Sequence, residues 1–94
     1  MIENLNKDFE SRVRLGIMSI LIVNDWVEFS ELKDLLSLTD GNLASHVKAL
    51  EAKEYIEVKK EFVAKKPKTS YRITQLGRVS FTEHIAALEN LLKK

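Results

Sequence analysis

The sequence contains no cysteine, which excludes disulfide frameworks, thiolate nucleophiles and metal sites built on thiolate ligands. It has a single proline, and no linker, internal repeat or low-complexity tract divides it into separate parts. The apolar run over residues 15–23 is far shorter than the ~20 residues that a membrane span requires. No signal peptide is visible, because residues 1–10 are polar and acidic rather than basic and then apolar. We therefore expect one cytoplasmic domain over residues 1–94, with no membrane partner.

Sequence signatures of catalysis are absent as well. There is no H-E-x-x-H, no glycine-rich phosphate loop and no G-x-S-x-G. The two histidines, His46 and His84, fall on different predicted helices without a carboxylate partner pattern. Glu83 cannot share a helix face with His84, because adjacent residues point about 100° apart. We expect neither enzyme activity nor a cofactor or metal site.

Charges are unevenly distributed along the chain, although the net charge is only +1. Residues 1–40 carry a net charge of −4, whereas residues 41–72 carry +4. A basic excess confined to one part of the chain is typical of a nucleic-acid surface, and the alternative is a solvated lysine-rich face. Hydrophobic residues make up 45% of the chain, so the domain can bury a real core.

Apolar residues at helical spacing predict four helices. They cover residues 8–24, 30–37, 39–53 and 74–92. Ser30, Thr39 and Thr74 are the expected N-caps, since a hydroxyl can accept from an unpaired amide of the first turn. The first predicted helix is apolar on more than one face, so it should be buried on more than one side, by the rest of the domain or by a partner subunit.

A strand-like pair with a basic turn follows the third predicted helix. This hairpin is expected over residues 55–73. Pro67 suits its turn, because proline cannot donate to a sheet ladder. Lys60 is the one exception to the alternation of apolar and polar residues along the first strand. A shorter strand-like segment precedes the second helix at residues 26–29.

The order of these elements predicts the fold. Two short helices joined by a tight turn form a helix-turn-helix, whose second helix can enter the DNA major groove. A basic hairpin after a helix-turn-helix is the layout of a winged helix. The expected fold class is mainly α with a small β-hairpin (α+β), a winged helix-turn-helix with an additional C-terminal dimerisation helix.

The third predicted helix has an apolar face and a small, polar face. Leu43, Val47 and Leu50 share one side and should pack inward. The other side can enter the groove and hydrogen-bond base edges or phosphates. The candidate DNA contacts here are Thr39, Gly41, Asn42, Ser45, His46, Lys48 and Ala49. His46 lies at the edge of the inward face and either supports the helix or contacts bases, while Thr39 either binds phosphate or only caps the helix.

The predicted hairpin turn supplies a second set of candidate contacts. Lys65, Lys66 and Lys68 carry three charges, with no acidic residue between Phe62 and Arg72. Such a turn can follow the phosphate backbone or enter the minor groove, where the potential is negative. The alternative is a solvated hairpin whose lysines only maintain solubility. Arg72 lies on the face of its strand opposite Tyr71 and Ile73, and it either orients the hairpin or contacts phosphate.

Four segments carry a recognisable pattern: Phe29-Ser30-Glu31-Leu32, Leu38-Thr39-Asp40-Gly41-Asn42-Leu43, His46-Val47-Lys48-Ala49-Leu50-Glu51 and Lys65-Lys66-Pro67-Lys68-Thr69-Ser70-Tyr71-Arg72-Ile73-Thr74. Together they resemble the short winged-helix transcriptional regulators of bacteria and archaea, relatives of the MarR and ArsR families. The resemblance implies that the third helix is the recognition helix, the lysine turn the wing, and the terminal helices the dimer contact. ArsR-like metal sensors carry cysteine or clustered histidine ligands that this chain lacks, so metal sensing is not expected.

The last predicted helix repeats apolar residues at i, i+4, i+7 and i+11. With the first helix it offers more apolar surface than so small a domain readily covers, which favours a homodimer. The expected interface residues are Phe9, Val13, Phe81, Ile85, Leu88 and Leu92. The alternative is a helix folded wholly onto its own domain.

These observations predict sequence-specific binding of double-stranded DNA by a homodimeric transcriptional regulator. Residues 39–53 would enter the major groove, and residues 64–69 would lie on the backbone or in the minor groove. The alternative is a winged-helix protein–protein interaction module without DNA binding, because a fold does not determine a function. A third hypothesis adds a small-molecule effector in a dimer cleft.

Overall fold

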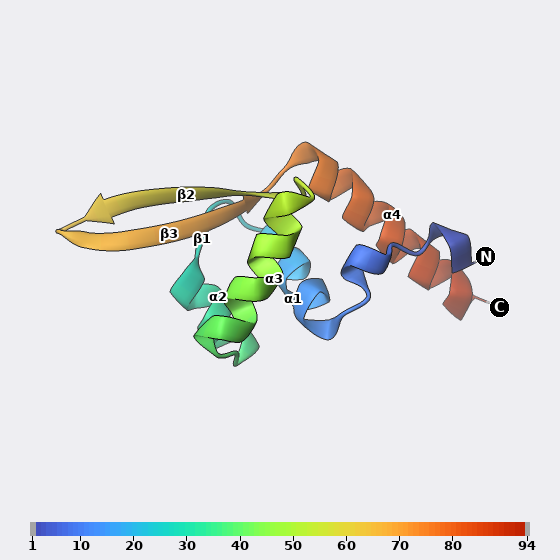
Figure 1. Cartoon of the computed structure of the whole chain (residues 1–94). Coiled ribbons are helices and arrows are strands. Elements are labelled where there is room, and N and C mark those ends of the chain that lie inside the picture. Colours follow the sequence, from blue (N-terminus) through green and yellow to red (C-terminus); the bar gives the residue numbers. More distant parts are fainter. Residues whose placement is uncertain (1, 94) are drawn as a thin grey trace.

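The computed structural model describes residues 2–93. Two short 3-10 helices come first, and they are followed by four α-helices and three strands (Figure 1). The elements are η1 (Ile2–Asn4), η2 (Lys7–Phe9), α1 (Arg12–Ile22), β1 (Val27–Glu28), α2 (Phe29–Leu36), α3 (Asp40–Ala52), β2 (Ile56–Val63), β3 (Lys66–Ile73) and α4 (Gln75–Leu92). The predicted α+β class, with a β-hairpin and a C-terminal helix, is confirmed.

The three strands form one antiparallel sheet in the order β1-β3-β2. Tyr71 of β3 pairs with both Val27 of β1 and Val58 of β2, so the sheet has three strands only where it meets the core. Beyond that level, β2 and β3 continue alone as a hairpin that projects away from the helices (Figure 1). The molecule is therefore elongated, with extents of 53 × 25 × 21 Å.

The turn of the hairpin lies earlier than predicted. Val63 pairs with Lys66, which leaves Ala64 and Lys65 as a two-residue connection. Both have positive φ, 54° and 66°, as a type I′ turn requires. This turn matches the twist of its strands, although neither residue is the glycine or asparagine that usually occupies it.

Pro67 lies in β3, so its predicted place in the turn was wrong. It pairs with Phe62, one step inside the pair that flanks the turn. Flanking residues of a two-residue turn exchange hydrogen bonds, and the next pair does not. On its other side β1 reaches only Ser70. The missing N–H of the proline therefore costs no ladder hydrogen bond.

The first helix is shorter than the predicted range 8–24. The Ser11 hydroxyl accepts from the Arg14 amide at 3.3 Å and begins α1 at Arg12. Before it, the Asn6 side chain accepts from the Asp8 amide at 2.8 Å and caps η2. Two successive local caps compete with one continuous helix, and here they prevail.

The second helix also begins differently from the prediction. Glu28, not Ser30, is the N-cap residue of α2. The Glu28 amide donates to the Glu31 carboxylate at 3.1 Å, which is one half of a capping box. Ser30 therefore lies inside the first turn.

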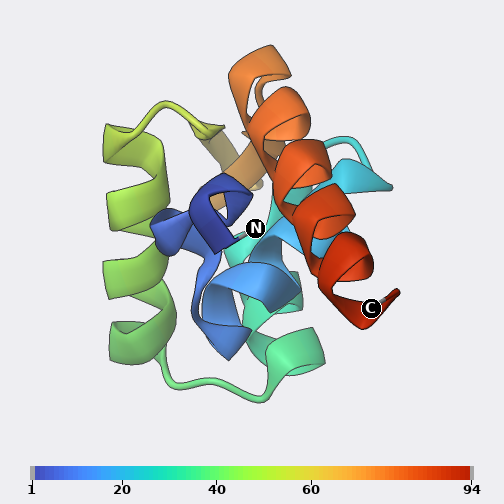
Figure 2. The ribbon, with the colours of Figure 1, turned by 90° about the vertical axis from the view of Figure 1, so that its right-hand side faces the viewer.

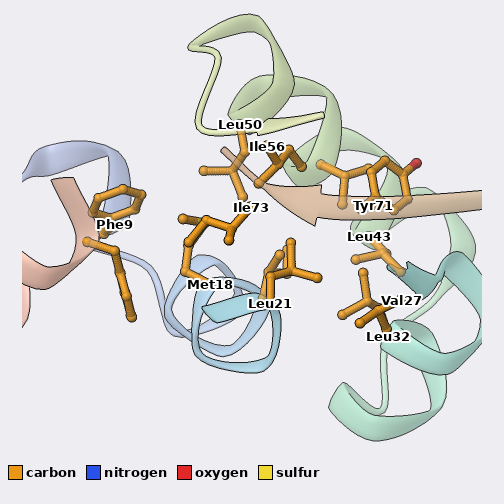
Figure 3. Packing of buried hydrophobic residues seen from close by; sticks show 13 residues of the cluster. Phe9, Met18, Leu21, Val27, Leu32, Leu43, Leu50, Ile56, Tyr71 and Ile73 are labelled. Atoms are coloured by element: carbon orange, nitrogen blue, oxygen red, sulfur yellow. The ribbon is translucent and has the colours of Figure 1, made fainter. Parts of the chain in front are cut away.

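The hydrophobic core lies between the sheet and helices α1, α2 and α3 (Figure 3). Its buried members are Phe9, Ile17, Met18, Leu21, Val27, Leu32, Leu43, Val47, Leu50, Ile56, Tyr71, Ile73 and Phe81. The three inward residues predicted for the third helix are all among them. This packing fixes α3 against the sheet and leaves its opposite face free.

The segment before α1 packs against the last helix. Phe9 is fully buried, and its ring lies 4.9 Å from Tyr55, 5.4 Å from Phe81 and 5.6 Å from His84. Phe9 and Phe81 were predicted at a dimer interface, but they belong to the core of their own chain. They have almost no surface left for a partner, because the segment before α1 folds Phe9 inward and packs its ring against Phe81.

The start of α4 is held against the turn between α3 and β2. The Thr74 hydroxyl accepts from the Gly77 amide at 2.9 Å, as expected for an N-cap, and donates to the Glu54 carbonyl at 2.7 Å. A Cβ at Gly77 would lie 2.0 Å from the Tyr55 carbonyl oxygen, so only glycine fits this contact. Figure 2 shows α3 and α4 on opposite sides of the molecule, with α1 and the N-terminal segment between them.

Candidate nucleic-acid interface

The turn between α2 and α3 is tightly fixed. Ser37 ends α2 in the left-handed region at φ 54°, and its amide donates to the Asp34 carbonyl at 3.3 Å. The Thr39 hydroxyl then accepts from the Asn42 amide at 3.2 Å and caps α3. This predicted cap is confirmed. The short turn sets the two helices at a defined angle, as a helix-turn-helix requires.

The outer face of α3 is small, polar and exposed. Gly41, Asn42, Ser45 and Lys48 are exposed, and Ala49 is half-buried. A Cβ at Gly41 would have no heavy atom within 4 Å, and the residue has no positive φ. Neither packing nor backbone conformation therefore requires glycine at this position. The absence of a side chain leaves the helix backbone open to close approach at this point.

His46 points away from this outer face. Its Nδ1 accepts from Nε of Arg14 in α1 at 3.1 Å, and Arg14 also donates to the Asp8 carbonyl at 3.3 Å. Burial lowers the pKa of His46 by disfavouring its charged form, and the Arg14 guanidinium lowers it further. Of the two roles predicted for His46, this contact favours support of α3 over contact with bases.

The lysines of the hairpin differ in their surroundings. Lys65 and Lys66 are exposed, and neither forms an ion pair within residues 2–93. Lys68, by contrast, lies 3.5 Å from the Glu28 carboxylate and 3.9 Å from that of Glu61. Although residues 63–71 contain no acid, carboxylates from the two neighbouring strands therefore lie beside Lys68. Lys65 and Lys66 keep their charges available at the tip.

Arg72 is held on the outer side of the sheet. Its guanidinium donates from Nε to the Glu57 carboxylate at 3.0 Å and lies 3.7 Å from Asp25. It also stacks over the Trp26 ring at 4.4 Å, where the Lys59 ammonium lies at the same distance. Of the two roles predicted for Arg72, these contacts favour orienting the hairpin.

Lys60 is a candidate contact that sequence reasoning did not select. It pairs with Thr69, and it is exposed on the side of the sheet that faces the helices. It lines a cleft between α3 and the hairpin. The cleft is formed by Ala44, Val47, Lys48, Glu51, Val58, Lys60 and Tyr71. The sequence does contain a signal for this residue. Lys60 breaks the alternation of apolar and polar residues along the strand, because a cation stands where an apolar residue is expected.

The cleft joins the two basic elements of the surface. Lys48 projects from the outer face of α3, and Lys60 and the hairpin tip continue the positive charge away from it. Burial is the main reason that the pKa of Tyr71 in its floor is raised, and the Glu51 carboxylate adds to this. The charged side chains that line the cleft are Lys48, Lys60 and Glu51, so its two lysines leave a net positive charge there. Within residues 2–93, no cluster of three or more histidine, aspartate or glutamate side chains is placed to hold a metal ion.

A capped helix-turn-helix followed by a basic hairpin defines a winged helix-turn-helix domain, of the class found in transcriptional regulators. The family model for winged helix DNA-binding domains matches residues 13–92, and the chain belongs to this family. The resemblance drawn from the four sequence segments, to winged-helix transcriptional regulators, is therefore confirmed.

Similar proteins agree with this assignment. MJ0432, an uncharacterized protein of Methanocaldococcus jannaschii, is 41% identical over 87 residues, which cover 93% of this chain and 95% of that protein. A transcriptional regulator homologue from Pyrococcus horikoshii has a similar structure, with a TM-score of 0.81 and 30% identity over 97% of this chain and 95% of that one. HlyU from Vibrio cholerae shares the fold, with a TM-score of 0.68 and 22% identity over 94% and 87% of the two chains. No helix within residues 2–93 has the length and apolar character needed to cross a membrane.

Proposed function

We propose that this protein binds double-stranded DNA sequence-specifically as a homodimer and regulates transcription. In this proposal α3 enters the major groove and reads base edges, while the hairpin of β2 and β3 acts as the wing on the backbone or in the minor groove. The observation that carries it is the outer face of α3, where an unobstructed Gly41 lies among exposed hydrogen-bonding side chains.

Each candidate contact has a role that its position supports. Asn42 and Ser45 can hydrogen-bond base edges or phosphates, and Lys48 can reach guanine acceptors or phosphate oxygens. The Ser45 hydroxyl donates to the Asn42 carbonyl at 3.0 Å, so it is oriented and keeps its lone pairs for an incoming donor. Thr39 lies at the N-terminus of α3, where the helix dipole favours a phosphate.

The lysines at the tip of the wing are not neutralised by acidic side chains of the described residues. Lys65 and Lys66 have no ion-pair partner within residues 2–93, so binding phosphate breaks no existing contact. Lys60 extends the same surface toward α3. Lys68 and Arg72, which already face carboxylates, contribute by fixing the hairpin.

Self-association through α4 is the second part of the proposal. Leu76, Val79 and Leu92 are exposed on α4, and Ile85 and Leu88 are half-buried. This helix lies on the side of the molecule opposite α3 (Figure 2). A two-fold dimer formed there leaves both α3 helices free, and dimers of this class place them about 34 Å apart, one turn of DNA.

Selection of bound fragments from sheared genomic DNA, followed by affinity measurement over a salt series, tests this function. We expect enrichment of a sequence with two-fold symmetry and an affinity that falls steeply with salt, since phosphate contacts release counterions. Failure to bind any duplex at low salt would overturn the proposal and favour a protein–protein interaction module.

A further inference from the structure

Phe62 is the most exposed aromatic side chain of the hairpin, at 78%. It pairs with Pro67, which is also exposed, close to the turn. Neither residue belongs to the hydrophobic core, and no ring contact within residues 2–93 involves Phe62. The far end of the wing therefore presents an exposed apolar pair that does not pack into the core.

The surroundings of this pair are cationic. Side chains alternate along β2, so Phe62 shares its side of the hairpin with Lys60, whereas Glu61 points to the other side and lies 3.9 Å from Lys68. Lys65 and Lys66 flank the pair at the turn, without ion-pair partners in residues 2–93. The apolar surface is thus surrounded by unpaired positive charge. A second copy of the same surface would be repelled, so charge complementarity favours a polyanion.

The reach of the wing fits the spacing of DNA grooves. β2 leaves the core near Val58, which pairs with the buried Tyr71. At roughly 3.3 Å per residue, Phe62 lies about 13 Å beyond Val58 and the turn about 20 Å beyond it. Half a helical turn of DNA, from a major groove to the adjacent minor groove, is about 17 Å. The far end of the hairpin can therefore reach the minor groove when α3 occupies the major groove.

We infer that Phe62 inserts into the minor groove beside the α3 site and contacts sugars and base edges there, with Lys60, Lys65 and Lys66 on the flanking phosphates. The minor groove is about 6 Å wide, and its walls are deoxyribose rings below the phosphates, which suits an aromatic ring between cations. Apolar wedges in this groove partly unstack base steps, and flexible pyrimidine–purine steps yield most easily. Phe62 thereby favours A·T-rich flanks that contain such steps, without any hydrogen bond to a base.

This inference rests on the proposed function. It predicts a different salt dependence for Phe62 than for the lysines. An apolar contact releases no counterion, so removing it should lower affinity without changing the salt dependence. Removing a lysine should change both.

The test compares Phe62→Ala with Phe62→Leu and with a control, Val63→Ala. Val63 is 49% exposed and lies next to Phe62 on the opposite side of the strand. The probes are two duplexes of about 30 base pairs, roughly three helical turns, one rich in TA steps and the other rich in G·C pairs. Binding is measured by fluorescence anisotropy over a salt series, and unstacking by the emission of 2-aminopurine placed at a TA step.

We expect Phe62→Ala to bind the TA-rich duplex roughly tenfold more weakly, a ratio typical of truncating one aromatic side chain that binding buries. The salt slope should match that of the wild type, the 2-aminopurine signal should fall, and Phe62→Leu should bind more tightly than Phe62→Ala. Val63→Ala should bind like the wild type. All variants should unfold at the wild-type urea concentration, because both side chains are exposed.

Three outcomes would overturn the inference. Equal binding by Phe62→Ala and the wild type would remove Phe62 from the interface while leaving the proposed function intact. A lower molar mass of Phe62→Ala in light scattering would assign the apolar pair to contact with a second copy. Binding of neither duplex by the wild type at low salt would reject both the inference and the proposed function.

Discussion

The backbone amide of Asn6 donates to Nδ1 of His84 at 2.9 Å, across 78 positions of the chain. His84 is only 2% exposed, and it packs beside Phe9 and Phe81. One hydrogen bond thus fastens the N-terminal segment to the middle of α4. The same segment also reaches Tyr55, whose hydroxyl donates to the Asp8 carboxylate at 2.9 Å.

Replacing His84 with alanine should lower the free energy of unfolding by about 2 to 4 kcal/mol. The change leaves a cavity at a buried side chain and removes the acceptor of the half-buried Asn6 amide, and both are costly. Urea unfolding measures the effect. Glu83→Ala, an exposed neighbour on α4, is the matched control and should stay within about 0.5 kcal/mol of the wild type.

Two glycines on different helices should respond in opposite ways to alanine. At Gly77 the new Cβ would meet the Tyr55 carbonyl oxygen at 2.0 Å, so stability should fall by about 2 kcal/mol or more. At Gly41 it meets nothing, so stability should rise by about 0.5 kcal/mol as the unfolded chain loses freedom. Gly41→Ala should nevertheless weaken DNA binding, because the methyl group lies on the outer face of α3. Unchanged affinity would place that face outside the interface.

Local capping made most of the helices predictable from the sequence. Thr39 and Thr74 each mark a helix start through one hydroxyl and one nearby amide, and both helices begin where expected. The hairpin turn was missed for an equally local reason. Ala64 and Lys65 adopt positive φ without the usual glycine or asparagine, so Pro67 was the stronger turn signal.

The charges of the wing could not be assigned from sequence because their partners are distant along the chain. Lys68 looked free among its neighbours, but the fold brings Glu28 of β1 beside it. Arg72 likewise meets Asp25 and Glu57 only when the sheet assembles. Which lysines stay unpaired depends on strand register, and a one-residue shift would exchange the two sides of the hairpin.

The salt dependence of DNA binding should separate the free lysines from the paired one. Replacing Lys65 and Lys66 together with alanine should reduce the log–log salt slope by about two units, one for each phosphate that is no longer neutralised. Lys68→Ala should change the slope less, because its ammonium already neutralises carboxylates. A reduction of about one unit by Lys68→Ala, as large as the effect of each lysine at the tip, would show that Lys68 exchanges its protein partners for phosphate.

His46 should make stability depend on pH. Burial, and then the charge of Arg14, lower its pKa in the folded protein below the ordinary value of 6.5. The unfolded chain therefore takes up the proton first. The contribution of His46 to stability is complete above about pH 7, declines as the pH falls through 6.5, and is lost once the pH passes below the folded-state pKa.

Urea unfolding of the wild type and of His46→Gln over this pH range tests the dependence. Glutamine retains an acceptor for Arg14 but does not titrate, so the variant should lose less stability on acidification. Parallel curves for the two proteins would assign the acid sensitivity to other groups.

The oligomeric state is tested most directly at the end of α4. Leu92 is 86% exposed, and Leu88, one turn earlier, is half-buried. Changing both to glutamate should convert a dimer into a folded monomer, since burying unpaired carboxylates in an apolar contact is far too costly. Light scattering at micromolar concentration reads the mass, with Leu35→Glu as the control because Leu35 is 66% exposed on α2. A wild-type protein that is itself a folded monomer would reject the dimer and show that α4 packs only against its own domain.

The monomeric variant should protect a single half-site on DNA, since the second α3, about 34 Å away, is absent without the partner subunit.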